Sequence, residues 1–358
     1  MDCRRRTFPY IYNASIMKQF VFYKKENYPA YTKTRPGETR LGETIMAVQN
    51  EKNWQHELKR SSAQFVIVGI PEDIGVRANL GTGGTHTAWN AFLASFFNIQ
   101  QNDFLDGNRI LLLGYFDFSG WQKELEGKPL EILRETTAKI DKLVAGVVKK
   151  IVVEGKIPVI IGGGHNNAYG NIKGTVLGLH ETGRSKTASI NVINLDAHTD
   201  FRILEGRHSG NGFSYAFSEG LLAKYAVLGA HENYIPAGIV EEIKRNKNLK
   251  VITYEELFVR QPNGWDESMR SLLSFTKNNF TGIELDMDAI ENVLSSAVSP
   301  SGVTVARARQ FIHRAASESK VAYLHICEGA AELSNKQKSS NTGKLIAYLV
   351  SDFIKAVK

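Results

Sequence analysis

Apolar and polar residues follow two alternating patterns along most of this chain. From residue 64 onward, short apolar runs rich in Val, Ile and Leu alternate with longer amphipathic stretches. Short apolar runs predict strands, and apolar residues three and four apart predict helices. We expect strands at 64–70, 109–116, 157–162, 190–195, 225–229, 250–253, 282–287 and 321–327. We expect helices at 86–97, 129–153, 166–181, 236–246, 265–279, 304–319 and 342–357.

Several predicted strands are apolar at every position. The runs Ile110–Leu113 and Val159–Ile161 contain no polar side chain. Such strands are typical of parallel sheets that helices cover on both faces. The regular alternation of strands and helices therefore predicts a three-layer α/β domain.

The first 60 residues are polar and irregular, and they carry most of the chain's net charge. They hold 12 Lys or Arg and 6 Asp or Glu, whereas the remaining 298 residues hold 32 and 31, giving +7 in all. We predict that residues 1–60 form an N-terminal arm or extension and that 61–358 form the α/β domain. A partly ordered tail is the alternative. Nucleic-acid binding through this basic segment is a third hypothesis, but no recognition motif supports it.

The composition also narrows the class and location of the protein. Cys3 and Cys327 are too few for a disulfide framework and lack metal-ligand spacing. The chain contains no apolar run of membrane-spanning length, and no apolar stretch follows the basic N-terminus as in a secretory signal. We expect a cytoplasmic protein whose partner is a small molecule rather than a membrane or a nucleic acid.

Four short segments with acidic or histidine residues each follow a predicted strand. They are Gly162–His165, Asp196–Asp200, Asp286–Asp288 and Glu328. In open α/β sheets, ligands bind at the carboxyl ends of the strands. We therefore expect the four segments to converge on one crevice.

These segments supply a set of candidate metal ligands. The candidates are His165, Asp196, His198, Asp200, Asp286 and Asp288. Residues two apart on an extended chain point the same way, which predicts that the acidic side chains of each segment face one pocket. Clustered carboxylates require positive charge, and oxygen and nitrogen ligands suit Mn²⁺, with Fe²⁺, Co²⁺ or Ni²⁺ as alternatives. So many ligands predict two metal ions, an arrangement that activates a bridging water.

At these residues the sequence resembles the ureohydrolase family of arginases, agmatinases and formimidoylglutamases. The family motifs are Gly-Gly-(Asp/Gly)-His, Asp-Ala-His-x-Asp, Ser-x-Asp-x-Asp and a Glu after the last core strand. The match runs from about residue 64 to the C-terminus. The resemblance implies an arginase-like α/β/α fold with an eight-stranded, mostly parallel sheet, two Mn²⁺ per chain, and a homo-oligomer, either trimer or hexamer.

The resemblance also implies a role for each candidate. His165 and Asp200 would bind one metal, His198 and Asp288 the other, with Asp196 and Asp286 bridging both. Asp200 would also accept a proton and pass it to the leaving amine. Glu328 would receive the amidinium or guanidinium group of the substrate. Arg202 is a candidate for pairing with a substrate carboxylate, with a salt bridge to another residue of the protein as the alternative, and Asn79, Asn167 and Asn211 are weaker candidates for substrate contacts.

Three features resemble the formimidoylglutamase branch. They are the loop Val68–Asn79, Gly164 where arginases usually carry Asp, and the sequence Asp200-Phe201-Arg202. Arginases carry a proton-shuttling His where this chain has Phe213, and His208 does not match that spacing. The resemblance thus implies hydrolysis of N-formimidoyl-L-glutamate to glutamate and formamide, a step of histidine degradation. The alternatives are an agmatinase or arginase-like hydrolase, and a family member that binds metal without turnover.

Overall fold

A ten-stranded sheet forms the centre of the computed structural model, which describes residues 18–260 and 264–358. The strands lie in the order β1-β4-β3-β5-β10-β9-β6-β7-β8, and β2 also pairs with β4. Their bounds are β1 (Phe20–Phe22), β2 (Met46–Ala47), β3 (Phe65–Gly69), β4 (Ile110–Phe116), β5 (Ile157–Ile161), β6 (Ile190–Leu195), β7 (Leu222–Ala230), β8 (Leu249–Thr253), β9 (Phe280–Asp286) and β10 (Lys320–Cys327).

The eight predicted strands correspond to β3 to β10, and every pairing among them is parallel. The expected count of eight is wrong by two, because β1 pairs antiparallel and β2 parallel with β4. Both come from the segment expected to be an arm. They span only three and two residues, too few for an alternating pattern to be recognised in the sequence. Residues 1–17 lie outside the described part of the chain.

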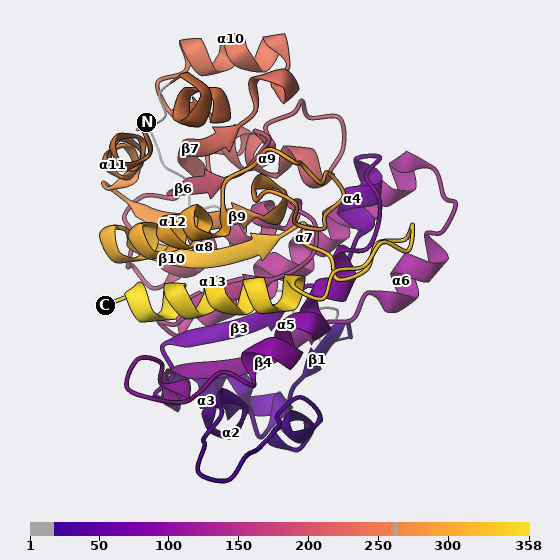
Figure 1. Cartoon of the computed structure of the whole chain (residues 1–358), viewed down its shortest axis with the longest axis vertical. Helices are drawn as coiled ribbons and strands as arrows, with labels where there is room; N and C mark the ends of the chain where they lie inside the picture. The colour runs from indigo at the N-terminus through magenta and orange to yellow at the C-terminus, as the bar shows by residue number, and fades with distance from the viewer. Residues whose placement is uncertain (1–17, 261–263) are drawn as a thin grey trace, which may run out of the picture.

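Two layers of helices cover the sheet, as predicted (Figure 1). Their bounds are α2 (Leu41–Thr44), α3 (Trp54–Arg60), α4 (Ile74–Ala78), α5 (Ala88–Phe96), α6 (Ser119–Glu124), α7 (Leu130–Val153), α8 (Asn167–Glu181), α9 (Gly212–Ser218), α10 (Ala237–Arg245), α11 (Trp265–Thr276), α12 (Val305–Glu318) and α13 (Thr342–Ala356). The seven long helices lie within a few residues of their predicted positions, whereas the sequence pattern did not reveal the short helices α2, α3, α4, α6 and α9.

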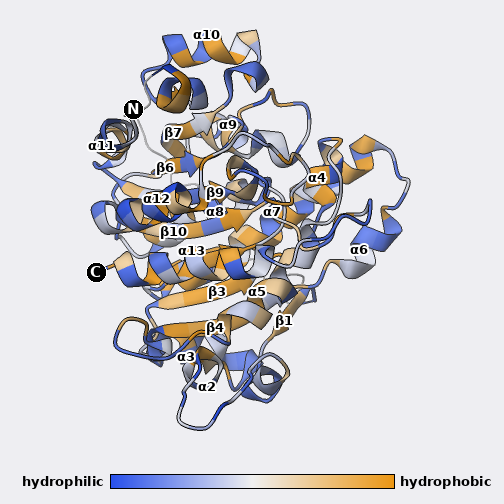
Figure 2. Ribbon diagram, in the orientation of Figure 1, coloured by the Kyte–Doolittle hydropathy of each residue, from blue (hydrophilic) through white to orange (hydrophobic). Residues whose placement is uncertain are grey.

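Alternate side chains of the strands pack into two separate cores. On β3, Phe65 and Ile67 join a core with α5, α11, α12 and α13, whereas Val66 and Val68 join a core with α3, α7, α8 and α9. Figure 2 shows that the central strands β3, β4 and β10 are hydrophobic, between helices with hydrophilic outer faces. None of the helices in the described ranges is long and apolar enough to cross a membrane.

Helices α7 and α8 pack unusually closely, and this contact fixes the start of α8. A Cβ atom on Gly174 would lie 2.6 Å from the carbonyl oxygen of Ala145, and one on Gly170 would lie 2.9 Å from Val144. Only glycine permits this approach of the two backbones. The amino end of α8 follows directly on His165, so the helix contact also positions that side chain.

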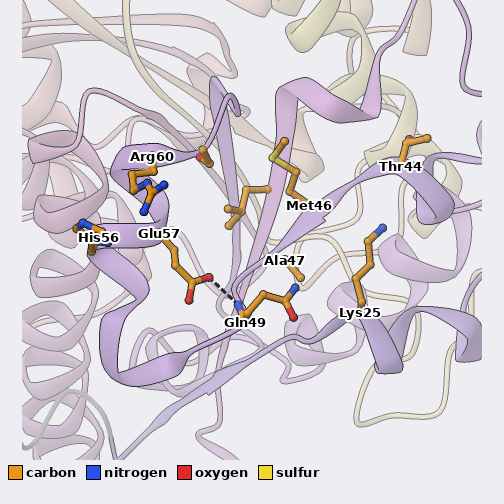
Figure 3. Close-up of a pocket in the computed structure, with 10 residues that line it drawn as sticks. Lys25, Thr44, Met46, Ala47, Gln49, His56, Glu57 and Arg60 are labelled. Carbon is orange, nitrogen blue, oxygen red and sulfur yellow. Dashed lines mark hydrogen bonds between the residues drawn. The ribbon is translucent and has the colours of Figure 1, made fainter.

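A shallow hollow of about 510 Å³ opens beside β2. Figure 3 shows Lys25 and Thr44 on one side of it and His56 and Arg60 on the other. It lies beside Leu111, near the amino end of β4. The four candidate segments follow the carboxyl ends of other strands, so this hollow is not the predicted crevice.

Candidate metal centre

The four strands that precede the candidate segments are neighbours in the sheet. Their order is β5-β10-β9-β6, and all three pairings are parallel. Their carboxyl ends therefore meet at one edge. The chain crosses from β5 to β6, continues outward to β7 and β8, and then returns to place β9 and β10 in the gap. Open α/β sheets bind ligands at such a reversal of strand order.

His165 lies at the centre of one group of predicted ligands. Its Nδ1 atom is 2.9 Å from Oδ2 of Asp200, 3.1 Å from Oδ2 of Asp286 and 3.3 Å from Oδ2 of Asp196. His165, Asp196 and Asp286 are buried. One imidazole nitrogen and three carboxylate oxygens from three different strand ends therefore surround one point, close enough to hold a metal ion.

His198 lies at the centre of the second group. Its Nδ1 atom is 3.6 Å from Oδ1 of Asp196 and 3.6 Å from Oδ1 of Asp288. Asp196 thus turns one carboxylate oxygen toward each histidine. In this geometry Asp286 belongs to the first group and not to the second. Its role as a bridge between two metal ions therefore stays a prediction. The structure brings all six predicted ligands together.

The expected reason for this convergence is wrong in one respect. We expected extended segments with alternate residues on one side, but the chain leaves the strand conformation at both places. Asp196 Oδ1 accepts a hydrogen bond from His198 N at 2.7 Å, and Asp286 Oδ1 accepts one from Asp288 N at 2.9 Å. Each first aspartate therefore holds a tight turn through its own side chain. These turns, rather than strand alternation, bring the later residue back to the site.

The glycine triplet before His165 forms a turn that other residues do not tolerate. Gly162 and Gly163 have φ values of +87° and +75°. A Cβ atom on Gly163 would lie 2.4 Å from Asn167 Nδ2 and 2.8 Å from the oxygen of Ile70. The buried carboxylate of Glu72 accepts hydrogen bonds from Gly164 N at 3.1 Å and from Asn167 Nδ2 at 2.8 Å. Glu72, which sequence reasoning did not single out, thus holds the turn that directs His165.

The charges of the site are not balanced within the described protein. Burial and the charge of Asp196 raise the pKa of Asp200 to about 6, and burial and the charge of Asp288 raise the pKa of Glu328 to about 8. Asp288 Oδ1 and Glu328 Oε2 are buried and accept no hydrogen bond from the described residues. Bound cations would relieve this repulsion, and the oxygen-rich donor set fits Mn²⁺.

Glu328 sits beside the first group in a rarely populated backbone conformation. Its φ is +61°, and its Oε1 accepts a hydrogen bond from His165 N at 2.8 Å. The residue is buried, and its second oxygen remains free for a further donor. This geometry suits the predicted role of receiving an amidinium group.

The predicted substrate contacts divide into two kinds. Arg202 and Asn79 flank Gly210, and both remain partly exposed. The Arg202 side chain is 55% exposed and lies 3.5 Å from Oε1 of Glu205. Asn79 donates a hydrogen bond to Ser209 Oγ at 3.3 Å. Both stay candidates, because their polar groups remain accessible.

Asn211 and Asn167 already have hydrogen-bond partners within the protein, and their role as substrate contacts stays a prediction. Asn211 is buried, its Oδ1 accepts from Arg207, and its Nδ2 donates to the oxygen of Gly206 at 2.8 Å. Asn167 is also buried and bonds Glu72. Both amides therefore shape loops around the site.

His208 is likewise held in place. Its Nδ1 accepts a hydrogen bond from Gly210 N at 3.1 Å, and its Nε2 lies 3.2 Å from Oε1 of Glu205. The ring is buried, and this burial lowers its pKa to about 4. Phe213, at the place of the arginase histidine, packs edge-on against His165 with ring centres 5.0 Å apart. An apolar ring there excludes proton transfer from that position.

A buried ion pair that the sequence did not reveal anchors the loop between Asp200 and Asn211. Arg207 Nε donates to Asp141 Oδ2 at 2.8 Å, and its Nη2 donates to the oxygen of Asn166 at 2.9 Å. The guanidinium also lies between the rings of Tyr169 and Tyr215. Asp141 is 66 positions away on α7, so no local pattern indicates the pair.

A second buried group, which the sequence patterns did not single out, lies beside the predicted metal ligands. Glu284 accepts hydrogen bonds from Tyr323 Oη at 2.6 Å and from His325 Nδ1 at 2.6 Å. Burial would raise the pKa of Glu284, but His325 and His165 lower it to about 2. The signal was present in the sequence, because Glu284 is two residues before Asp286 on β9, and Tyr323 and His325 are alternate residues on β10.

Comparisons with known proteins agree with this geometry. The family model described as the arginase family matches residues 63–355. A formimidoylglutamase from Streptococcus pyogenes is 26% identical over 200 residues, which cover 54% of this chain and 55% of the relative. The chain thus spans about half the length of the curated relatives it matches.

Solved structures share the fold. A Trypanosoma cruzi formiminoglutamase with Mn²⁺ has a TM-score of 0.66 at 19% identity, covering 89% of this chain and 98% of the other. A Bacillus subtilis formimidoylglutamase has a TM-score of 0.70 at 16% identity, covering 92% and 97%. An agmatine ureohydrolase of Thermoplasma volcanium has a TM-score of 0.60 at 18% identity, covering 84% and 90%. Identities this low establish the fold alone.

Proposed function

Because the chain belongs to the arginase family, we propose that it is a dinuclear manganese hydrolase of a linear amidine. The proposed substrate is N-formimidoyl-L-glutamate, and the products are glutamate and formamide. The observation that carries the proposal is the position of Asp196, whose two carboxylate oxygens face His165 and His198. The names of the matched relatives support the choice of substrate.

The donor set divides into two metal sites. His165 and Asp200 would hold one Mn²⁺, His198 and Asp288 the other, and Asp196 and Asp286 would contact both. When bound, two such ions supply a water that is acidic enough to act as a nucleophile near neutral pH. The trimeric or hexameric assembly and the cytoplasmic location stay predictions from the sequence.

Three side chains of the site have further tasks in the proposed reaction. Asp200 accepts a proton and releases it to the departing amine nitrogen of glutamate. Glu328 uses its free Oε2 to orient the cationic amidine through charge-assisted hydrogen bonds. Arg202 pairs with a carboxylate of the substrate in this proposal, which its 55% exposure and the bidentate geometry of guanidinium groups support.

Removal of the shared ligand tests this function. We expect the wild type to bind two Mn²⁺ per chain and to hydrolyse formimidoylglutamate. Asp196→Ala should lose both metal binding and turnover, measured by metal analysis after dialysis and by a formamide assay. Asp266→Ala is the control, since that carboxylate is 71% exposed on α11. Retained activity in Asp196→Ala would contradict the proposed site, and two bound Mn²⁺ without any amidine hydrolysis would favour a binding role.

A further inference from the structure

Glu284 lies at the centre of a buried polar network directly beneath the metal ligands. Its carboxylate, Tyr323 and His325 are all fully buried. Tyr323 donates to Oε1 and His325 donates to Oε2 of the same carboxylate, each at 2.6 Å. A buried carboxylate is costly unless several donors satisfy it, and here two donors from β10 fix its position.

The two ring nitrogens of His165 face different groups. Its Nδ1 atom faces Asp196, Asp200 and Asp286, whereas its Nε2 atom points to the other side. That Nε2 atom is buried and makes no hydrogen bond of ordinary geometry with the described residues. Oε2 of Glu284 lies 3.5 Å from it, so a small shift of either side chain would complete the bond.

We propose that Glu284 is the positioning residue for His165. Its carboxylate accepts the Nε2 proton of His165, which leaves the lone pair of Nδ1 directed at the first metal site. In a metal-bound histidine, one ring nitrogen binds the metal and the other makes a hydrogen bond. That hydrogen bond determines which nitrogen is left to bind the metal. It also makes the ligand more basic and orients the ring. This inference rests on the proposed function, because it requires His165 to be a metal ligand.

The sequence supports a special task for this carboxylate. The ureohydrolase motif that the chain resembles carries Ser at this place, whereas this chain carries Glu284 two residues before Asp286. A serine hydroxyl is shorter and uncharged. A carboxylate in its place reaches farther and binds a histidine N–H more strongly, because charge-assisted hydrogen bonds are about twice as strong as neutral ones.

The first test measures Mn²⁺ affinity rather than activity. Glu284→Gln keeps the shape of the side chain and removes its charge. We expect Mn²⁺ binding at one of the two sites to weaken about 10- to 100-fold, measured by titration of the apo-protein with Mn²⁺ and detection of free Mn²⁺ by electron paramagnetic resonance. Tyr323→Phe is the matched control, since it removes the hydrogen bond to the other oxygen of the same carboxylate. Equal weakening in both variants, or none in Glu284→Gln, would overturn the proposal.

A double-mutant cycle shows whether the effect acts through His165. In a His198→Asn background, the remaining metal site contains His165. Glu284→Gln should weaken the Mn²⁺ affinity of that site by the same factor as in the wild-type background. In a His165→Asn background, the remaining site contains His198, and Glu284→Gln should change its affinity less than about twofold. A role limited to packing would weaken binding alike in both backgrounds and would contradict the proposal.

A crystal structure of the Mn²⁺-loaded wild type provides a test that does not depend on whether Glu284→Gln folds. We expect His165 Nε2 and Glu284 Oε2 to lie about 2.8 Å apart, the length of a charge-assisted hydrogen bond. A separation above about 3.5 Å would overturn the proposal. Failure of the proposed function is distinct, because the wild type would then bind no Mn²⁺ or hydrolyse no amidine, whatever the state of Glu284.

Discussion

Two residues of the site adopt left-handed backbone conformations that residues other than glycine rarely adopt. Asp200 has a φ of +43° and Glu328 a φ of +61°. Such conformations cost about 1–3 kcal/mol each and persist where the surrounding structure imposes them. Asp200 and Glu328 are also the two residues to which we assign proton transfer and substrate orientation. The strain coincides with the chemistry, which is typical of functional sites.

Glu328→Gln tests the assignment of substrate orientation. The amide keeps the hydrogen bond to His165 N but lacks the negative charge that faces an amidinium. We expect kcat/KM for formimidoylglutamate to fall about 10- to 100-fold, since hydrogen bonds to charged groups contribute about 1.5–3 kcal/mol. Metal content should stay at two Mn²⁺ per chain. Unchanged kcat/KM, or loss of metal, would assign Glu328 a different role.

His208 predicts a pH dependence of folding stability. Its pKa is about 4 in the folded protein and about 6.5 in an unfolded chain, so the unfolded state binds more protons between these values. Stability should therefore be complete above pH 6.5 and fall as the pH is lowered toward 4. Urea unfolding of the wild type and of His208→Gln across this range measures the slope. The variant should show a shallower slope, and identical slopes would contradict the account.

At the scale of elements, turns and loops rather than strands define the site. The glycine triplet turns the chain after β5, the side chains of Asp196 and Asp286 hold the turns after β6 and β9, and Arg207 anchors the loop that follows Asp200. Each of these contacts fixes backbone that carries a predicted ligand or substrate contact. Changes in them should thus affect stability and the site together.

The glycine turn gives a prediction with a closely matched control. Gly163 and Gly127 have φ values of +75° and +69°, but a Cβ on Gly163 would clash, and one on Gly127 would meet nothing within 4 Å. Gly127→Ala should cost about 1–2 kcal/mol of folding free energy from the left-handed conformation alone. Gly163→Ala should cost more and should lower Mn²⁺ content. If urea unfolding gave the same loss of folding free energy for both variants, the neighbours of Gly163 would accommodate the added Cβ, and the prediction would be contradicted.

The buried pair of Arg207 and Asp141 predicts a large loss of stability. Arg207→Ala leaves the Asp141 carboxylate unpaired inside the protein, which typically costs about 3–5 kcal/mol. Arg245→Ala is the comparison, because its pair with Glu241 is mostly exposed and such pairs contribute about 0–1 kcal/mol. Urea unfolding of the two variants checks the difference, and a loss below about 1 kcal/mol for Arg207→Ala would contradict the anchoring role.

In the molecule as a whole, the sequence predicted the features that follow from local patterns of apolar and acidic residues. Buried apolar runs located β3 to β10, and acidic motifs at their ends located the candidate metal centre. The strands β1 and β2 were missed because they are too short to show a period. The pair of Arg207 with Asp141 was missed because it joins residues 66 positions apart, and such a contact leaves no periodic signal. Glu284 precedes Asp286 by two residues on β9, but its contact with His325, 41 positions away, depends on the pairing of β9 with β10 that the structure reveals.

The products of the reaction decide whether this site hydrolyses formimidoylglutamate as proposed. Purified protein with Mn²⁺ would be offered formimidoylglutamate, arginine, agmatine and guanidinobutyrate, and the products would be identified by nuclear magnetic resonance. We expect equal amounts of formamide and glutamate from formimidoylglutamate, because Asp200 delivers its proton to the glutamate nitrogen. Release of ammonia with N-formylglutamate, or of urea from a guanidine substrate as the main activity, would contradict it.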